Sequence, residues 1–118
     1  MKHFSYAEFD SPDFPDSGNN MDKHFLRLLD NARQIAGIPF KINSGFRTPK
    51  HNAKVGGSEN SSHLRGFAVD IHATSSSDRF KILSALIEVG FTRIGIANTF
   101  INVDADPIKT KDVIWTYA

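Results

Sequence analysis

The sequence predicts an α+β domain in which a small, mainly antiparallel sheet packs against two main helices. Two segments, residues 21–36 and 75–89, carry apolar residues at helical spacing, and short stretches around them alternate apolar and polar residues as strands do. The chain has 118 residues and a hydrophobic content of 40%, which suits one globular domain spanning residues 1–118. Because helices and a sheet each bury one face, these elements are expected to form two packed layers.

Residues 1–20 are expected to form an ordered arm on the surface of this domain. They are rich in Asp, Ser, Pro, Gly and Asn, which favour turns over regular elements. They also contain four aromatic side chains, and disordered segments are poor in aromatic residues. We therefore expect the aromatic side chains to hold the arm against the core. They are Phe4, Tyr6, Phe9 and Phe14.

The first helix is predicted over residues 21–36, with Asn20 as its N-cap and Gly37 as its stop. Residues 39–44 then alternate apolar and polar positions like a strand with one face in water. A short helical piece is expected over residues 50–55. The remaining strands are predicted at residues 67–72, 92–96, 100–103 and 113–117.

The second main helix is predicted to begin at Ser75, because Ser75 to Asp78 resembles a capping box. Gly90 is expected to end it. Its apolar spacing predicts a buried stripe of four side chains, and aromatic residues elsewhere are expected in the core by default. The predicted stripe is Phe80, Leu83, Leu86 and Ile87, and the aromatic core residues are Phe25, Phe80 and Trp115.

Composition excludes several classes of function. The formal net charge is +1, and the sequence has no basic block, so neither a nucleic-acid nor a membrane partner is expected. The chain contains no cysteine, which excludes disulfides, a thiol nucleophile and cysteine-bound metal. The N-terminus lacks the apolar stretch of a secretory signal, so we expect synthesis in the cytoplasm without a signal peptide. We expect a monomer.

Polar residues gather near the ends of the predicted strands. Arg47 follows the first strand, His63 precedes the second, and Asp70 lies on the second. Asn102 and Asp104 lie on a later strand at a spacing of two, which points both side chains to the same face. If these strands are neighbours, the polar side chains meet on one face of the sheet. Histidine and aspartate there could supply two of the three protein ligands of a catalytic zinc site.

These residues belong to strings that closely resemble the peptidase M15 family. That family comprises zinc peptidases related to D-alanyl-D-alanine carboxypeptidases and to phage L-alanyl-D-glutamate endolysins. The resemblance runs from about Phe4 to Tyr117, and it implies a hedgehog-like, zinc-binding α+β fold. The strings are Ser44-Gly45-Phe46-Arg47-Thr48, His51-Asn52, Val55-Gly56-Gly57, Ser61-x-His63-x-x-Gly66-x-Ala68-x-Asp70 and Phe100-Ile101-Asn102-Val103-Asp104.

The resemblance implies that His63 and Asp70 bind one Zn²⁺ ion. The third ligand of the family is a histidine in a Phe-x-His-x-Asp string, and the matching position in this chain is Asn102. An asparagine carbonyl is a weak, neutral ligand for zinc and offers no imidazole nitrogen. A site made of His63, Asp70 and Asn102 is therefore expected to hold zinc loosely or to lose it.

Four further site residues are predicted. The resemblance implies that Arg47 lies near the substrate and steadies charge on the attacked carbonyl. Relatives often carry an acidic general base three positions before the third ligand, where this chain has threonine, so Asp104 is the candidate for proton transfer or an alternative ligand. Ser61 is expected to hydrogen-bond near the metal or the substrate. His72 lies two residues after Asp70 and could be a structural residue, a spare ligand or a partner that orients Asp70.

Two functions fit these observations. The first is a zinc-dependent peptidase that hydrolyses stem peptides or cross-bridges of peptidoglycan, weakened by Asn102. Such a chain would act on the cell wall after phage-type release or as a component of the virion. The second is a non-catalytic module that binds muropeptides on the same fold. The sequence leaves open which peptide bond would be cut and whether Asn102 is a natural or an introduced residue.

Overall fold

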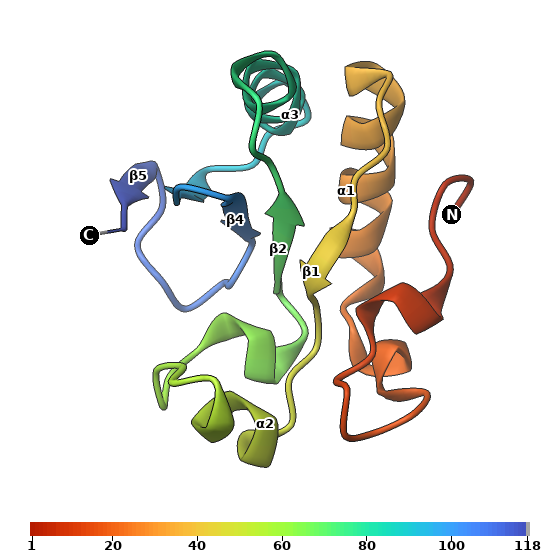
Figure 1. Ribbon diagram of the computed structural model, residues 1–118, viewed down its shortest axis with the longest axis vertical. Helices are drawn as coiled ribbons and strands as arrows, with labels where there is room; N and C mark the ends of the chain where they lie inside the picture. Colours follow the sequence, from red (N-terminus) through yellow and green to blue (C-terminus); the bar gives the residue numbers. More distant parts are fainter. Residues whose placement is uncertain (118) are drawn as a thin grey trace.

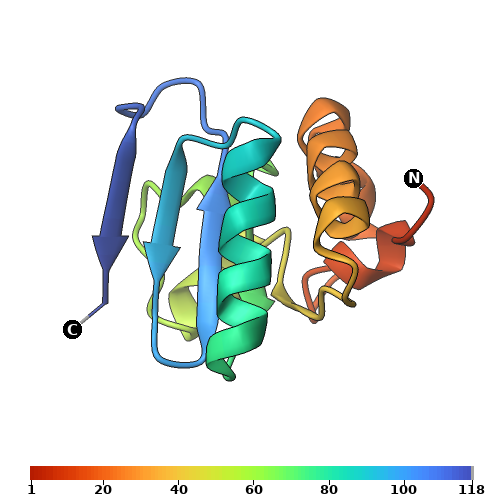
Figure 2. The same ribbon diagram turned by 90° about the horizontal axis from the view of Figure 1, so that it is seen from above.

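The structure is a computed structural model that describes residues 1–117. Within these residues, five strands form one sheet in the order β1-β2-β4-β3-β5. Neighbouring strands are antiparallel, except that β3 and β5 are parallel. The strands are β1 (Ile42–Ser44), β2 (Ala68–His72), β3 (Arg93–Ile96), β4 (Phe100–Asp104) and β5 (Val113–Thr116). The helices α1 (Lys23–Ala36) and α3 (Ser76–Glu88) lie on one side of the sheet, which confirms the predicted α+β class (Figures 1 and 2).

Helix α1 begins and ends at side chains suited to those positions. The Asp22 carboxylate accepts a hydrogen bond from the Phe25 N–H at 2.9 Å and caps the first turn. Gly37 ends the helix with φ of +69°, the left-handed conformation that glycine adopts without strain. The predicted stop is confirmed. The N-cap is Asp22 instead of the predicted Asn20, because Asn20 belongs to the preceding 3₁₀ turn η2 (Ser17–Asn20).

Helix α3 begins as predicted but buries a different face. The Ser75 hydroxyl accepts a hydrogen bond from the Asp78 N–H at 3.1 Å, which confirms the predicted start. However, Phe80 is 73% exposed and Ile87 is 51% exposed, so the predicted stripe is wrong at these positions. The helix carries apolar residues around most of its circumference, and periodicity alone therefore did not select the buried face. The buried side chains are Ile82, Ala85 and Leu86.

The N-terminal arm packs against the domain through two of its four aromatic residues. Phe4 and Phe9 are buried with ring centroids 5.3 Å apart, whereas Tyr6 is 41% exposed and Phe14 is 53% exposed. The carboxylate of Asp30 on α1 accepts hydrogen bonds from the backbone N–H groups of residues 2 and 3, both at 2.9 Å. Hydrogen bonds from its backbone to Asp30, as well as apolar contacts, therefore hold the arm against α1.

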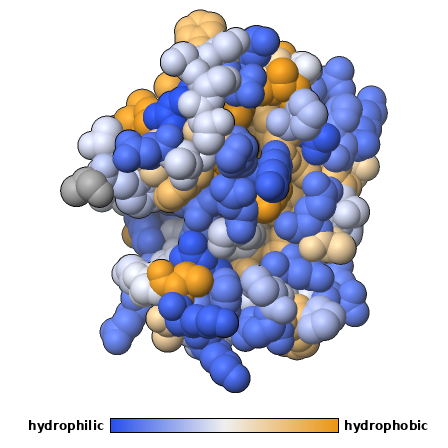
Figure 3. All heavy atoms as spheres, viewed as in Figure 1, coloured by the Kyte–Doolittle hydropathy of each residue, from blue (hydrophilic) through white to orange (hydrophobic). Residues whose placement is uncertain are grey.

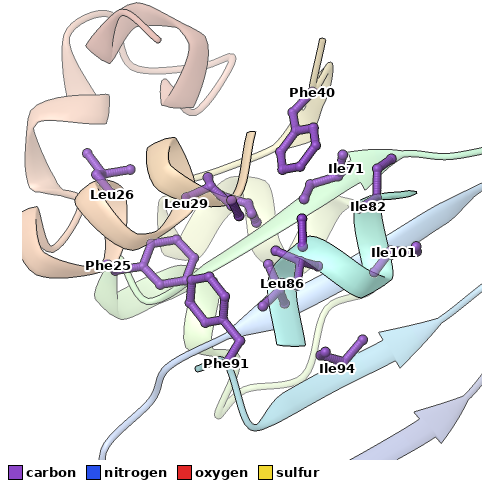
Figure 4. Close-up of a cluster of buried hydrophobic side chains, with 14 of the residues drawn as sticks. Phe25, Leu26, Leu29, Phe40, Ile71, Ile82, Leu86, Phe91, Ile94 and Ile101 are labelled. Atoms are coloured by element: carbon purple, nitrogen blue, oxygen red, sulfur yellow. The ribbon is translucent and has the colours of Figure 1, made fainter. Parts of the chain in front are cut away.

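The core lies between the sheet and the two main helices (Figure 4). Alternation along β4 points Ile101 and Val103 into this core and Asn102 to the opposite face. In the same way, β2 buries Val69 and Ile71 against the helices and presents its even-numbered residues on the other face. The site residues thus lie on the sheet face that α1 and α3 leave uncovered.

Two short helical segments lie beside that uncovered face. They are α2 (Pro49–Lys54), close to the predicted 50–55, and the 3₁₀ turn η3 (Ser62–Arg65). Hydrophilic residues cover most of the surface seen in Figure 3, which is hollowed between the part that carries β5 and the part that carries α2. No helix within residues 1–117 is long and apolar enough to cross a membrane.

Candidate metal and peptide-binding site

A cleft of about 360 Å³ opens on the uncovered face of the sheet. This volume lies at the lower end of the range for small-molecule sites and suits a few residues of an extended peptide. Its walls come from β2, β4, β5, η3 and the loop after α2. His72 is the one predicted site residue that does not line the cleft. The others do: Arg47, Ser61, His63, Asp70, Asn102 and Asp104.

Three of these side chains meet at the base of the cleft. Asp70 on β2 and Asn102 on β4 are direct cross-strand partners, and η3 brings His63 above them. The Nε2 atom of His63 lies 3.5 Å from Oδ1 of Asp70 and 3.3 Å from Nδ2 of Asn102. All three side chains are buried. The predicted convergence of residues 63, 70 and 102 is therefore present in the structure.

The backbone around His63 selects the form of its imidazole ring. Nδ1 lies 2.8 Å from the Gly45 carbonyl oxygen, which can only accept, so Nδ1 carries the proton. Nε2 then presents a lone pair to Asp70 and Asn102. The Ser61 hydroxyl accepts a hydrogen bond from the His63 N–H at 3.2 Å and helps to set the turn. This is the tautomer that a metal-binding histidine needs, with its second nitrogen held by a carbonyl.

The Asp70 carboxylate is held in its charged form. Burial raises the pKa of Asp70, but His63 when its ring is protonated, the hydrogen bond from Asn102 and the charge of Arg47 together outweigh it, so the pKa lies below its ordinary value of 3.8. The carboxylate is consequently ionised at neutral pH. An ionised oxygen and an imidazole lone pair 3.5 Å apart are placed as two ligands of one zinc ion would be, with bonds of about 2.0–2.2 Å.

Asn102 faces these two groups with its amide NH₂. Nδ2 donates a hydrogen bond to Asp70 Oδ1 at 2.8 Å and points its second hydrogen toward His63 Nε2. The NH₂ group thus makes the contacts that a cation would make, and it cannot bind a metal. To serve as a ligand, the amide must rotate and offer its neutral oxygen. No cluster of three His, Cys, Asp or Glu side chains with metal-binding geometry occurs within residues 1–117. His63 and Asp70 therefore fit a zinc ion, and Asn102 fits it poorly.

Arg47 is fixed at one wall of the cleft. Its Nε donates to Ser44 Oγ at 3.0 Å, Nη1 donates to Asn52 Oδ1 at 3.2 Å, and Nη2 donates to Asp70 Oδ2 at 3.3 Å. A guanidinium has five N–H donors, so two remain for a ligand in the cleft. Gly57 permits this arrangement, because a Cβ there would lie 2.1 Å from Asn52 Oδ1.

Asp104 lines the same cleft but is engaged with another residue. Its Oδ1 accepts hydrogen bonds from Arg93 Nε at 2.8 Å and from the Asp106 N–H at 3.1 Å. Oδ2 has no hydrogen-bond partner within residues 1–117 and can accept a proton. Asp104 and Asn102 share a face of β4 but lie about 6.6 Å apart along the strand. Asp104 therefore makes no contact with the residues at the base of the cleft.

His72 lies away from the site. It is exposed at the end of β2, opposite Phe100, and within residues 1–117 it makes no hydrogen bond to Asp70. The structure therefore does not bring His72 to Asp70 as an orienting partner. The Gly45 carbonyl and Asn52 orient the site residues instead, through His63 and Arg47.

Trp115 lines the cleft instead of filling the core, which corrects its predicted position. Gly95 on β3 lies between Asn102 and Trp115 in the register of the sheet. A Cβ at Gly95 would lie 2.4 Å from Trp115 Nε1, so the indole ring covers this glycine. The signal in the sequence was the spacing of Val113, Trp115 and Tyr117, which places alternate residues of the last strand on one face.

Asp106 joins η3 to the loop after β4. Its buried carboxylate accepts hydrogen bonds from Ser62 Oγ at 2.8 Å and from the Ile108 N–H at 3.2 Å, and it forms an ion pair with Arg65. Burial raises the pKa of Asp106, but the contacts with Arg65 and Ser62 outweigh it, and the pKa lies below 3.8. This carboxylate is therefore an anchor between two walls of the cleft.

Replacement of this anchor is expected to change the acid stability of the chain. Because the pKa of Asp106 is lower in the folded state, its contribution is complete above the unfolded value and is lost as the pH falls through the folded value. Asp106→Asn should lower the free energy of unfolding by about 1–3 kcal/mol at pH 7. The difference from the unaltered chain should shrink below pH 3.8. Urea unfolding between pH 7 and pH 2.5 measures it, and a difference that stays constant over this range would contradict the role of the charged form.

The fold and the cleft are consistent with a small α+β peptidase. Residues 2–104 match the family model described as Peptidase M15, a span that contains every residue at the base of the cleft. The chain therefore belongs to the peptidase M15 family. No curated protein matches the chain. The match ends before the loop that precedes β5 and before β5 itself.

Proposed function

We propose that the chain is a zinc-dependent peptidase of peptidoglycan stem peptides whose metal is weakly held because Asn102 occupies the position of the third ligand. The observation that carries this proposal is the 3.5 Å separation of His63 Nε2 and Asp70 Oδ1 at the base of an open cleft. Membership of the peptidase M15 family supports peptide-bond hydrolysis as the reaction. The proposed site of action is the cell wall, reached after phage-type release or as part of a virion.

The side chains of the cleft have distinct roles in this proposal. A bound zinc ion would polarise the scissile carbonyl and activate a water molecule. The two unused N–H groups of Arg47 would stabilise negative charge on the carbonyl oxygen, an effect that is typically worth a few kcal/mol. Asp104 Oδ2 would accept a proton and return it to the leaving amine. Ser61 sets the turn that holds His63 in place.

Hydrolysis of purified peptidoglycan tests this proposal. We expect the chain to release new amino termini slowly, at a rate that rises with added zinc because the site is far from saturated. His63→Ala should abolish the release at every zinc concentration, since it removes a ligand that the fold holds in place. Equal release by His63→Ala, or no release at any zinc concentration, would contradict the proposed reaction.

A second candidate is a non-catalytic module that binds stem peptides. The Asn102 amide favours it, because its NH₂ group occupies both acceptors that a metal would use. This candidate predicts peptide binding that is unchanged by a chelator and no release of amino termini at any zinc concentration. The same peptidoglycan assay, combined with a binding measurement in chelator, separates the two candidates.

A further inference from the structure

Within residues 1–117, one cation of the cleft lacks an anionic partner. Three basic side chains line the cleft: Arg47, Arg93 and Lys109. Arg47 pairs with Asp70 and Arg93 pairs with Asp104. Lys109 forms no ion pair within the described part of the chain. Because both carboxylates are already engaged, the positive charge of Lys109 is available to a ligand.

The loop that carries Lys109 is held at both ends. On one side, the Lys109 N–H donates to the Asp106 carbonyl oxygen at 3.3 Å, and Asp106 is itself anchored to η3. On the other side, Arg93 donates a hydrogen bond to the carbonyl oxygen of Thr110. The ammonium group is thus presented from a fixed backbone, which lowers the entropy cost of binding an anion.

Aromatic side chains line the same cleft. Trp115 lies beneath the Arg93 guanidinium, with 5.1 Å from Cζ to the centre of the indole ring. Phe100 and Tyr117 pack with ring centroids 5.4 Å apart. A cleft that holds both a free cation and aromatic side chains suits a ligand that combines a carboxylate with apolar groups, as a short acidic peptide does.

We propose that Lys109 binds a carboxylate of the stem peptide and so determines which part of the peptide lies over His63 and Asp70. This inference rests on the proposed function for the nature of the ligand. It concerns a residue beyond the span that matches the family. Two carboxylates share the required chemistry: the C-terminal carboxylate of the peptide and the α-carboxylate of its γ-linked D-glutamate.

Peptide binding measured by calorimetry in the presence of a chelator tests this role without turnover. The probes are a synthetic stem peptide with an L-alanyl-γ-D-glutamyl unit and free carboxylates, its C-terminal amide, and its D-isoglutamine analogue. The variants are Lys109→Gln, Lys109→Arg and Lys111→Gln, which removes an exposed lysine of the same loop that does not line the cleft.

Lys109→Gln is expected to bind the free acid about tenfold more weakly than the unaltered chain does, because a charge-assisted contact is lost. Lys109→Arg should keep most of the affinity, and Lys111→Gln should keep all of it. Each amide probe lacks one of the two carboxylates. If Lys109→Gln and the unaltered chain bind one of these probes equally well, Lys109 binds the carboxylate that this probe lacks.

Unchanged binding of the free acid by Lys109→Gln would overturn the role of Lys109 and leave the proposed function standing. An equal loss in Lys111→Gln would also overturn it, since the effect would then come from general charge. Failure of the unaltered chain to bind any of the three peptides would overturn both the carboxylate contact and the proposed substrate.

Discussion

Asn102→His is expected to raise the zinc affinity of the chain by roughly 10²–10³-fold. Structural zinc sites with four ligands bind with about 10–16 kcal/mol, or roughly 2.5–4 kcal/mol for each ligand. The substitution would replace a neutral amide by an imidazole ring. Position 102 of β4 already faces both His63 and Asp70. Competition with a fluorescent chelator at pH 7 measures the affinity, and release of amino termini from peptidoglycan measures the gain in hydrolysis.

Asn102→Ala is the matched control for this substitution. It removes the NH₂ group that occupies His63 Nε2 and Asp70 Oδ1 but adds no ligand. Only a small change in zinc affinity is expected. If Asn102→Ala raises the zinc affinity as much as Asn102→His does, the Asn102 amide merely obstructs the metal, and residue 102 is not a ligand position. If neither variant binds zinc more tightly, residues 63 and 70 do not form a metal site.

Phe25→Ala is expected to lower the free energy of unfolding by about 3–5 kcal/mol. The Phe25 side chain is fully buried and packs edge-to-face against Phe91, with ring centroids 5.5 Å apart. Truncation would leave a cavity between α1 and the turn that follows α3. Since a domain of this size is stable by about 5–15 kcal/mol, the loss is large and is measurable by urea unfolding at pH 7.

Phe80→Ala removes the same side chain from an exposed position and serves as the control. Phe80 lies on the outer face of α3, so its loss should change the free energy of unfolding by less than about 0.5 kcal/mol. A comparable loss in both variants would mean that the exposed face of α3 packs against something in solution.

Much of the fold could be predicted because its elements depend on local signals. Gly37 and Ser75 mark helix ends by backbone chemistry that acts within a few residues, and both positions are confirmed. The buried face of α3 was not predictable in the same way, since Phe80 and Ile82 are both apolar and only the packing against α1 and the sheet distinguishes them. Trp115 shows the same limit, because a large aromatic residue suits either a core or the wall of a cleft.

The three residues at the base of the cleft lie in two strings of the sequence, whereas no such string marks their surroundings. His63 and Asp70 lie in a short, specific pattern, and strand alternation brings Asn102 to the same face. The orientation of the Asn102 amide depends on hydrogen bonds among three distant segments. The engagement of Asp104 with Arg93 likewise depends on pairing between β3 and β4, which no local pattern specifies.

Titration of zinc into ¹⁵N-labelled, unaltered chain tests most directly whether residues 63, 70 and 102 surround one cation. We predict that the Nε2 resonance of His63 shifts strongly and that the side-chain NH₂ signals of Asn102 change as its hydrogen bonds to His63 and Asp70 break. The signals of His3, His24, His51 and His72 should respond weakly. Unchanged His63 and Asn102 signals at millimolar zinc, or a response confined to the other histidines, would contradict a metal site at this position.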